Sequence, residues 1–146
     1  MDCEVKIMQT PNGVKFPKKE HDGDAGFDVF SHFDHDIVLG FGEQWTFPLG
    51  FALEIPWGWV ALIQAKSGMA KSNGLFTIGN VIDCNYRGEV HATLCCFGQK
   101  PVKVEFLQKV AQMIIAPCYT SKRYEVVDRL TDTNRGAGGF GSTGLR

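Results

Sequence analysis

The chain has 146 residues, and its 15 basic and 16 acidic side chains give it a net charge of −1. This length suits one domain with a full hydrophobic core. The near-neutral charge provides no overall field that would attract nucleic acid or a membrane surface, so phosphate binding must be local. The sequence contains no apolar run long enough to span a membrane, and residues 1–10 lack the pattern of a signal peptide. We therefore expect a soluble, cytoplasmic protein that binds neither membranes nor nucleic acid.

The cysteines form no recognisable disulfide or metal-binding pattern. They are Cys3, Cys84, Cys95, Cys96 and Cys118, an odd number with no C-x-x-C spacing. A structural zinc site or a disulfide framework is therefore not predicted. We expect reduced thiols that mainly fill the core.

The composition and the spacing of turn residues predict an all-β fold. The chain has 17 glycines and 11 phenylalanines, and turn signals recur about every 8–12 residues. We interpret this pattern as a distorted antiparallel sandwich or barrel of the jelly-roll kind. Strands are predicted at residues 3–8, 51–55, 59–64, 88–97 and 110–115. Further strand material is predicted within residues 37–51, with breaks at the glycines and at Pro48. A short helical turn is predicted at residues 68–73, and residues 124–130 would end the globular part.

Two predicted strands carry polar residues within the apolar pattern. In 88–97, His91 lies on the face opposite the aliphatic side chains, which favours a structural or exposed role. In 110–115, Gln112 needs a hydrogen-bond partner if it is buried, or it serves a ligand. Trp57 and Trp59 flank a turn, which favours packing or an interface over catalysis.

Residues 134–146, NRGAGGFGSTGLR, form a glycine-rich tail. One interpretation is a flexible terminus, because the segment has too little apolar surface to order itself. The other is a nucleotide clamp, in which Arg135, Ser142 and Thr143 donate to phosphates and Phe140 stacks on a base. A dinucleotide-binding fingerprint is excluded, since only five residues follow Gly141 and they leave no room for the required helix.

Four further stretches place polar residues next to glycine. Residues 24–29 carry Asp28 between two hydrophobic residues, as a turn cap or a functional acid. Residues 65–70, AKSGMA, combine a cation, a hydroxyl and a glycine after a strand, a pattern that can form a small anion site. Residues 79–89 predict a hairpin that presents Asp83 and Tyr86 into a cleft, and residues 109–113 contain Gln112.

These four stretches and the tail, in this order and spacing, resemble the five motifs of the trimeric deoxyuridine triphosphatase (dUTPase) family. The resemblance covers residues 24–144, and its most specific parts are VIDCNYRGE and RGAGGFGSTG. It implies a jelly-roll homotrimer that hydrolyses dUTP to dUMP and pyrophosphate with Mg²⁺ on the triphosphate. This reaction limits uracil incorporation into DNA and supplies dUMP for thymidylate synthesis. The resemblance also implies a β domain at residues 1–133 and an arm at 134–146 that closes an active site shared with neighbouring copies.

The resemblance implies roles for the residues that match the family's motifs. Asp83 would deprotonate the water that attacks the α-phosphorus. Tyr86 would pack against the deoxyribose and exclude a 2′-hydroxyl, while Phe140 would cover the uracil. The uracil edge would be read by the backbone of the hairpin arm, which consists of Gly79, Asn80, Val81, Ile82 and Asp83.

Phosphate contacts are implied for the remaining motifs. Asp28 would support the water shell of the metal or orient phosphate-binding groups. The implied phosphate-binding residues are Lys66, Ser67, Gly68 and Gln112 in the body, and Arg135, Gly139, Gly141, Ser142 and Thr143 in the arm.

Four positions depart from the family pattern. Lys66 and Lys109 stand where arginine is usual, which keeps the charge but loses the bidentate fork. Asn80 replaces the usual glycine before VID, and its side chain can alter the uracil pocket. Asn85 replaces a common aspartate, which removes a negative charge near Asp83 and favours the ionised form of that acid.

Two other functions are alternatives at this stage. A dCTP deaminase on the same fold needs a glutamate as general acid and base at the pyrimidine. Glu89 and Glu105 are available glutamates, but neither lies in a stretch that resembles a deaminase site. A non-catalytic regulatory protein would have lost the aspartate or the arm, and this sequence retains both.

Overall fold

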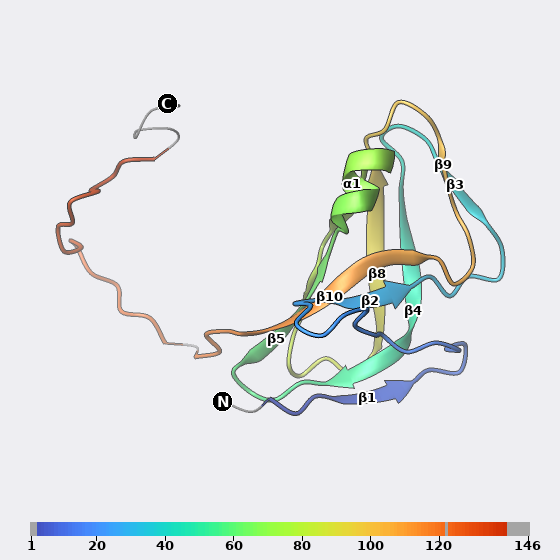
Figure 1. Cartoon of the computed structure of the whole chain (residues 1–146). Helices are drawn as coiled ribbons and strands as arrows, with labels where there is room; N and C mark the ends of the chain where they lie inside the picture. Colours follow the sequence, from blue (N-terminus) through green and yellow to red (C-terminus); the bar gives the residue numbers. More distant parts are fainter. Residues whose placement is uncertain (1–2, 122, 140–146) are drawn as a thin grey trace.

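The computed structural model describes residues 3–121 and 123–139, and its body is built mainly of antiparallel strands (Figure 1). The predicted all-β class and jelly-roll architecture are confirmed. The elements of the described part are β1 (Lys6–Gln9), β2 (Phe27–Phe30), β3 (Ile37–Leu39), β4 (Gln44–Glu54), β5 (Trp59–Gln64), α1 (Ser67–Asn73), β6 (Leu75–Ile78), β7 (Val81–Ile82), β8 (Glu89–Cys96), β9 (Val102–Val104) and β10 (Lys109–Pro117).

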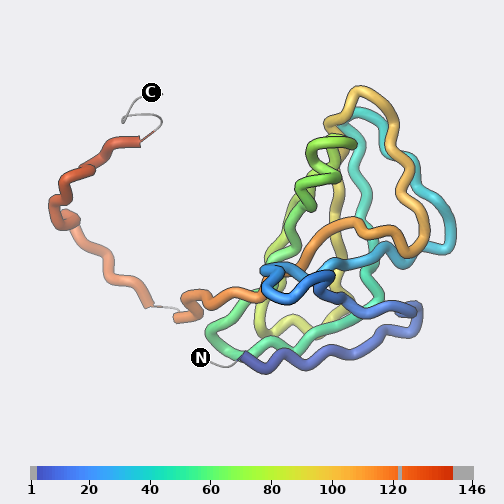
Figure 2. The backbone as a smooth tube through the Cα atoms, in the orientation of Figure 1, coloured from blue at the N-terminus to red at the C-terminus, as the bar shows by residue number. Residues whose placement is uncertain are grey.

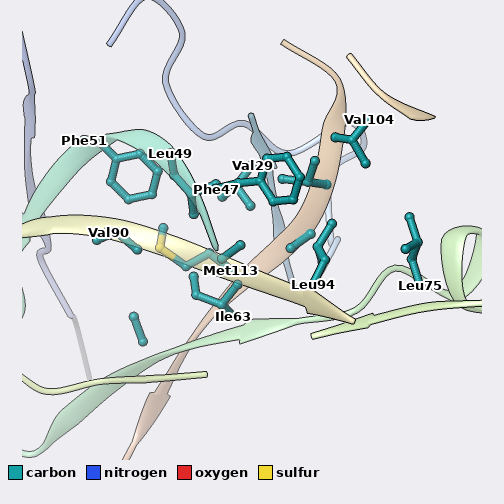
Figure 3. Packing of buried hydrophobic residues seen from close by; sticks show 14 of the residues in the cluster. Val29, Phe47, Leu49, Phe51, Ile63, Leu75, Val90, Leu94, Val104 and Met113 are labelled. Carbon is teal, nitrogen blue, oxygen red and sulfur yellow. The ribbon is translucent and has the colours of Figure 1, made fainter. Parts of the chain in front are cut away.

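Two four-stranded sheets share one core. One sheet has the strand order β1-β4-β8-β6 and the other β2-β10-β5-β7, while β3 and β9 pair separately. Figure 1 shows β2 and β10 running across the direction of the long strands β4 and β8. The core between the sheets is shown in Figure 3, where Phe47 and Leu94 come from the first sheet and Val29, Ile63 and Met113 from the second.

The period-two pattern predicted β8 correctly. Val90, Ala92, Leu94 and Cys96 are buried, whereas His91 points away from them and is exposed. Fully burying one aliphatic side chain such as Val or Leu contributes about 1.5–3 kcal/mol, so this register is strongly preferred over a shift by one residue. The strand therefore presents His91 on the face opposite the core.

The expected strand break near Pro48 was wrong. β4 runs without interruption from Gln44 to Glu54, and Gly50, at φ 78°, marks a shift in its pairing with β8 between Pro48 and Ala52. A bulge accommodates the positive φ angle without ending the strand. The strands β6 and β9, 4 and 3 residues long, were not predicted because so few residues show no recognisable alternation.

The predicted helical turn is α1, which ends at Gly74 in the left-handed conformation with φ 65°. All five cysteines are free, and Cys95 and Cys96 are buried in β8. Trp59 packs against the core, while Trp57 is 72% exposed. No helix of the described residues has both the length and the apolar character needed to cross a membrane.

The chain leaves the body after β10. Residues 119–121 and 123–139 contain no helix or strand, and Figures 1 and 2 show this segment extending away from the sheets. Tyr124, Val126 and Leu130 are each more than three-quarters exposed, at 86%, 85% and 79%. Regular structure thus ends before residues 124–130, and the domain boundary at residue 133 stays a prediction.

Candidate active site

The predicted hairpin lines a cleft of about 200 Å³. β7 pairs with β5 through Ala61 and Ile82, which fixes the arm that leads to Asp83. The turn that follows is closed by a hydrogen bond from the Tyr86 N–H to the Asp83 carbonyl oxygen at 3.1 Å. The lining residues are Gly79, Val81, Ile82, Asp83, Tyr86, Glu89, His91 and Thr93. Asp83 and Tyr86 therefore face one cleft, as the sequence predicted.

Hydrogen bonds to backbone carbonyls hold the turn of this hairpin. The Arg87 Nη1 donates to the Cys84 carbonyl oxygen at 2.8 Å and to that of Tyr86 at 3.0 Å. The Tyr86 hydroxyl donates to the Glu89 carbonyl oxygen at 2.9 Å, which lays the ring across Gly88. A Cβ atom at Gly88 would lie 2.6 Å from Cζ of Tyr86, so only glycine leaves room for the ring. Among the described residues, none donates a hydrogen bond to the Asp83 carboxylate.

A second cleft, of about 350 Å³, contains the lysine residues that depart from the family pattern. Its centre is Asp28 on β2, whose side chain is 8% exposed. The Lys66 ammonium donates to Asp28 Oδ1, and the Lys109 ammonium lies 2.8 Å from Oδ2. Both carboxylate oxygens are therefore occupied by lysines. The lining residues are Glu20, His21, Asp24, Ala25, Gly26, Asp28, Lys66, Lys109 and Gln112.

The two lysines determine the ionisation of Asp28. Burial by itself would raise the pKa of this carboxyl, but the hydrogen bonds from Lys109 and Lys66 outweigh burial and hold the pKa below its usual value. Hydrogen bonds to Asp28 and Glu20 raise the pKa of Lys109. Hydrogen bonds from Lys109 and Lys18 lower the pKa of Glu20. The cleft thus contains charged groups of both signs at neutral pH.

Gln112 has the partner that its position in β10 requires. Its Nε2 donates to the Ala65 carbonyl oxygen at 3.1 Å, which ties β10 to the residue before Lys66. A side chain at Gly26 would crowd the Gln112 amide, so this glycine allows β2 to approach it. Ser67 and Gly68 begin α1, directly after this cleft, but do not line it.

The two clefts lie at opposite ends of β5. Ile82, next to Asp83, pairs with Ala61, whereas Lys66 follows the other end of the strand at Gln64. At about 3.3 Å per residue, the six residues from the position opposite Asp83 to Lys66 span roughly 20 Å. The acid and the lysines of one chain therefore belong to separate clefts.

The described part of the arm touches neither cleft. Arg135 Nε donates to the Gly138 carbonyl oxygen at 2.9 Å, within the arm itself. Gly139 is the last described residue of the arm. Phe140, Gly141, Ser142 and Thr143 lie outside the described residues.

The dUTPase family model matches residues 12–144 of the chain. The chain belongs to the dUTPase family.

Known relatives and solved structures agree with this assignment. The deoxyuridine 5'-triphosphate nucleotidohydrolase of Alkaliphilus metalliredigens is 40% identical over 144 residues, which cover 97% of this chain and 98% of the relative. The Staphylococcus bacteriophage 80alpha dUTPase, solved with dUPNHPP, aligns with a TM-score of 0.83 at 23% identity over 97% of this chain and 99% of that one. A mutant dUTPase from phage phi11 of S. aureus, solved with a structural Mg(II) ion, has a TM-score of 0.72 at 21% identity over 84% and 96%. Both solved structures are less than 25% identical to this chain, so their similarity shows a shared fold.

Several cleft residues of this dUTPase-family chain were missed by sequence reasoning. His91 and Thr93 line the hairpin cleft because the outer face of β8 forms its wall. The alternation of β8 placed His91 on that face but gave no sign that this face forms a wall of the cleft. Glu20 reaches Lys109 across 89 positions of sequence, and no local pattern signals such a contact.

Proposed function

We propose that this member of the dUTPase family hydrolyses dUTP to dUMP and pyrophosphate, which limits uracil incorporation into DNA and supplies dUMP. The observation that carries the proposal is the cleft that Asp83 and Tyr86 of one hairpin both line. Asp83 is the general base that takes the proton of the water attacking the α-phosphorus. Tyr86 packs against the deoxyribose, and the backbone from Gly79 to Asp83 reads the uracil edge.

The second cleft supplies the phosphate-binding groups. Lys66, Lys109 and Gln112 face it, and Asp28 positions both ammonium groups through its two oxygens. Ser67, next in sequence to Lys66, adds a hydroxyl near the phosphates, and Gly68 leaves the backbone open there. Each lysine binds as a point charge and lacks the bidentate fork of the arginine that is usual at its position.

The residues of the second cleft do not suit direct metal coordination. Asp28 has both oxygens occupied by lysines, and the described residues contain no group of three or more His, Cys, Asp or Glu side chains that could hold a metal ion. This set of side chains fits a Mg²⁺ ion that arrives bound to the triphosphate and keeps its water ligands. Asp28 would then position the two lysines and not bind the metal directly. Mg²⁺ bound there would neutralise charge on the phosphate oxygens.

The proposed active site combines clefts from different copies in a homotrimer. A separation of roughly 20 Å along β5 exceeds what one nucleotide can bridge between its α-phosphorus and Lys66. The arm, residues 134–146, contributes Arg135, Gly139 and the residues that follow to a neighbouring copy's nucleotide, where binding offsets the entropy of ordering it. A chain truncated after Thr133 is expected to lose most hydrolysis while its trimer stays folded, as measured by sedimentation. Full activity of the truncated chain would refute the role of the arm.

The decisive experiment compares pyrophosphate release from dUTP, dTTP, dCTP and UTP in the presence of Mg²⁺. We expect turnover of dUTP alone. Asp83→Asn should abolish turnover while the protein still binds dUTP, because the substitution removes the base and keeps the shape. Loss of binding instead would give Asp83 a structural role.

The two alternatives have less support. Glu89 accepts hydrogen bonds from Thr10 Oγ1 at 2.6 Å and the Gly50 N–H at 3.2 Å, and Glu105 pairs with Lys103. Both glutamates therefore have structural partners instead of serving as the acid and base of a deaminase, and ammonia release from dCTP would contradict this assignment. A purely regulatory protein has no need for the intact acid hairpin.

A further inference from the structure

Glu89 connects the hairpin cleft to a distant part of the chain. It is the first residue of β8, and it lines the cleft together with Asp83 and Tyr86. Its backbone carbonyl oxygen accepts the hydrogen bond from the Tyr86 hydroxyl at 2.9 Å. The position of the Tyr86 ring therefore depends on where the backbone of Glu89 lies.

The carboxylate of Glu89 is held by two donors from other segments. Thr10, 79 positions away in sequence, donates from Oγ1 to Glu89 Oε1 at 2.6 Å. The Gly50 N–H donates to the same oxygen at 3.2 Å. Both bonds are partly buried, and hydrogen bonds to a carboxylate are among the stronger ones in proteins. Glu89 is thus anchored through its side chain and holds Tyr86 through its backbone.

Thr10 is itself fixed by the backbone around it. Its N–H donates to the Gly50 carbonyl oxygen at 3.1 Å, and its own carbonyl oxygen accepts from the Gly13 N–H at 2.9 Å. A Cβ atom at Gly13 would collide with the Gly50 carbonyl oxygen, so this glycine lets the two backbones approach each other. The Thr10 hydroxyl therefore meets Glu89 from a defined position.

The bond from Gly50 has a structural explanation, and the bond from Thr10 needs another. In the ladder between β4 and β8, Pro48 pairs with His91 and Ala52 with Glu89, so the shift in register lies at Gly50. A bulge leaves backbone groups of the ladder unpaired, and the Glu89 carboxylate satisfies the Gly50 N–H there. This pairing does not require the Thr10 hydroxyl. The hydroxyl instead adds a second direction from which the carboxylate is held.

A ring that excludes a single hydroxyl group must not yield when that group approaches. We propose that Thr10 is a positioning residue. Its bond to the Glu89 carboxylate keeps the Glu89 carbonyl oxygen, and with it the Tyr86 ring, where the ring excludes the 2′-hydroxyl of a ribonucleotide. Thr10 does not line the cleft, so it acts through Glu89. This inference rests on the proposed function, because it needs Tyr86 to pack against the deoxyribose.

The test is the binding of dUMP and UMP to the full chain by calorimetry. The two ligands differ only in the 2′-hydroxyl, so the ratio of their Kd values cancels the contacts that they share. Protein that has lost its fold lowers the number of binding sites and leaves this ratio unchanged. We expect Thr10→Val, which removes the hydroxyl at nearly constant size, to lower the preference for dUMP about three- to tenfold, the effect of about one hydrogen bond.

Two matched variants separate positioning from general stability. Thr10→Ser keeps the donor, so it should retain the wild-type ratio. Ser31→Ala removes a different hydroxyl, which is part of a side chain only 1% exposed and donates to the Glu105 carbonyl oxygen at 2.5 Å. It should destabilise the fold and still retain the wild-type ratio, because its bond involves neither Glu89 nor the hairpin.

A double-mutant cycle tests the route through Tyr86. Tyr86→Phe keeps the ring but removes the hydroxyl that reaches Glu89, so it should also lower the preference for dUMP. Adding Thr10→Val to Tyr86→Phe should then have no further effect on the ratio, because the link is already broken. Effects that add in full would show that Thr10 acts by another route and would overturn the proposal.

The remaining outcomes are equally decisive. A wild-type ratio in Thr10→Val, or a Thr10→Ser variant that behaves like Thr10→Val, would overturn the role of the hydroxyl. If Thr10→Val does not fold, Tyr86→Phe decides alone, and a wild-type ratio there would refute the positioning of the ring. If the wild-type chain hydrolyses dUTP but binds dUMP and UMP equally, this inference fails by itself. If it neither binds dUMP nor hydrolyses dUTP, the proposed function fails as well.

Discussion

Replacing Asp28 with asparagine tests the charge cluster of the second cleft. The substitution preserves size but leaves one acceptor oxygen for two lysines, and the new amide N–H₂ faces an ammonium group. Charge-assisted hydrogen bonds are worth about 1.5–3 kcal/mol each when buried. The Lys66 side chain is 30% exposed and Lys109 40%, so water and Glu20 recover part of the loss. We expect Asp28→Asn to lower the free energy of unfolding by about 1–3 kcal/mol at pH 7.

The pH dependence of this difference follows from the pKa of Asp28. Because the pKa is lower in the folded protein than in the unfolded chain, the ionised carboxylate stabilises the fold at pH values above the unfolded value, about 3.9. The stabilisation is lost as the pH falls through the still lower folded value. The wild-type protein should therefore exceed Asp28→Asn in stability equally at pH 7 and pH 5, and the gap should begin to narrow below about pH 4.

Urea unfolding at pH 7, 5 and 3.5 measures this gap, with all proteins at one protomer concentration because association shifts apparent stability. Asp36→Asn is the matched control, since its ion pair with Lys103 is exposed at 49% and 51% and should matter little. Equal stability of Asp28→Asn and wild type at pH 7 would refute the reasoning. A gap that stays constant down to pH 3.5 would show that packing, not charge, is responsible.

Two further substitutions follow from the cleft geometry. Glu20→Gln removes an anion that lies 2.9 Å from Lys109, so pyrophosphate should bind a few-fold more tightly, as measured by calorimetry. Asp22→Asn makes the same change of charge in the same loop and is the control; an equal gain there would show that only net charge matters. Gly88→Ala should displace the Tyr86 ring, because the new methyl group would lie 2.6 Å from Cζ, and it should lower kcat/KM for dUTP together with discrimination against UTP. Wild-type discrimination in this variant would mean that Tyr86 does not exclude the ribose hydroxyl.

The long strands of the fold were predictable because burial of one face imposes an alternation of apolar and polar residues on them. The aliphatic positions of β8 alternate with His91 and Thr93, and this pattern alone gave the strand within one residue at each end. The shift at Gly50 was not predictable, since a glycine in sequence marks equally well a strand end or a bulge. β9 is 3 residues long and depends on its pairing with β3, a partner more than sixty positions away.

The candidate site was predictable where it lies in short motifs. Asp83 and Tyr86 are three positions apart on one hairpin, so their common cleft follows from local structure. The links from Lys109 to Glu20 and Asp28 join distant segments, and only the packing of β2 against β10 brings them together. Ser142 and Thr143 lie outside the described residues, and in the proposed assembly their roles depend on the surface of a neighbouring copy, so these roles stay predictions.

The placement of the two clefts at opposite ends of β5 also affects how loss-of-function mutations combine. In the proposed assembly, a subunit that lacks Asp83 still contributes intact lysines to an active site shared with a neighbouring copy. A subunit that lacks Lys66 still contributes an intact Asp83 to another such site. Mixing two such inactive proteins under conditions that let subunits exchange would regenerate some intact centres. A copy that lacks both Asp83 and Lys66 would damage two centres at once, so such a double mutant expressed beside a normal gene would remove more activity than its own share.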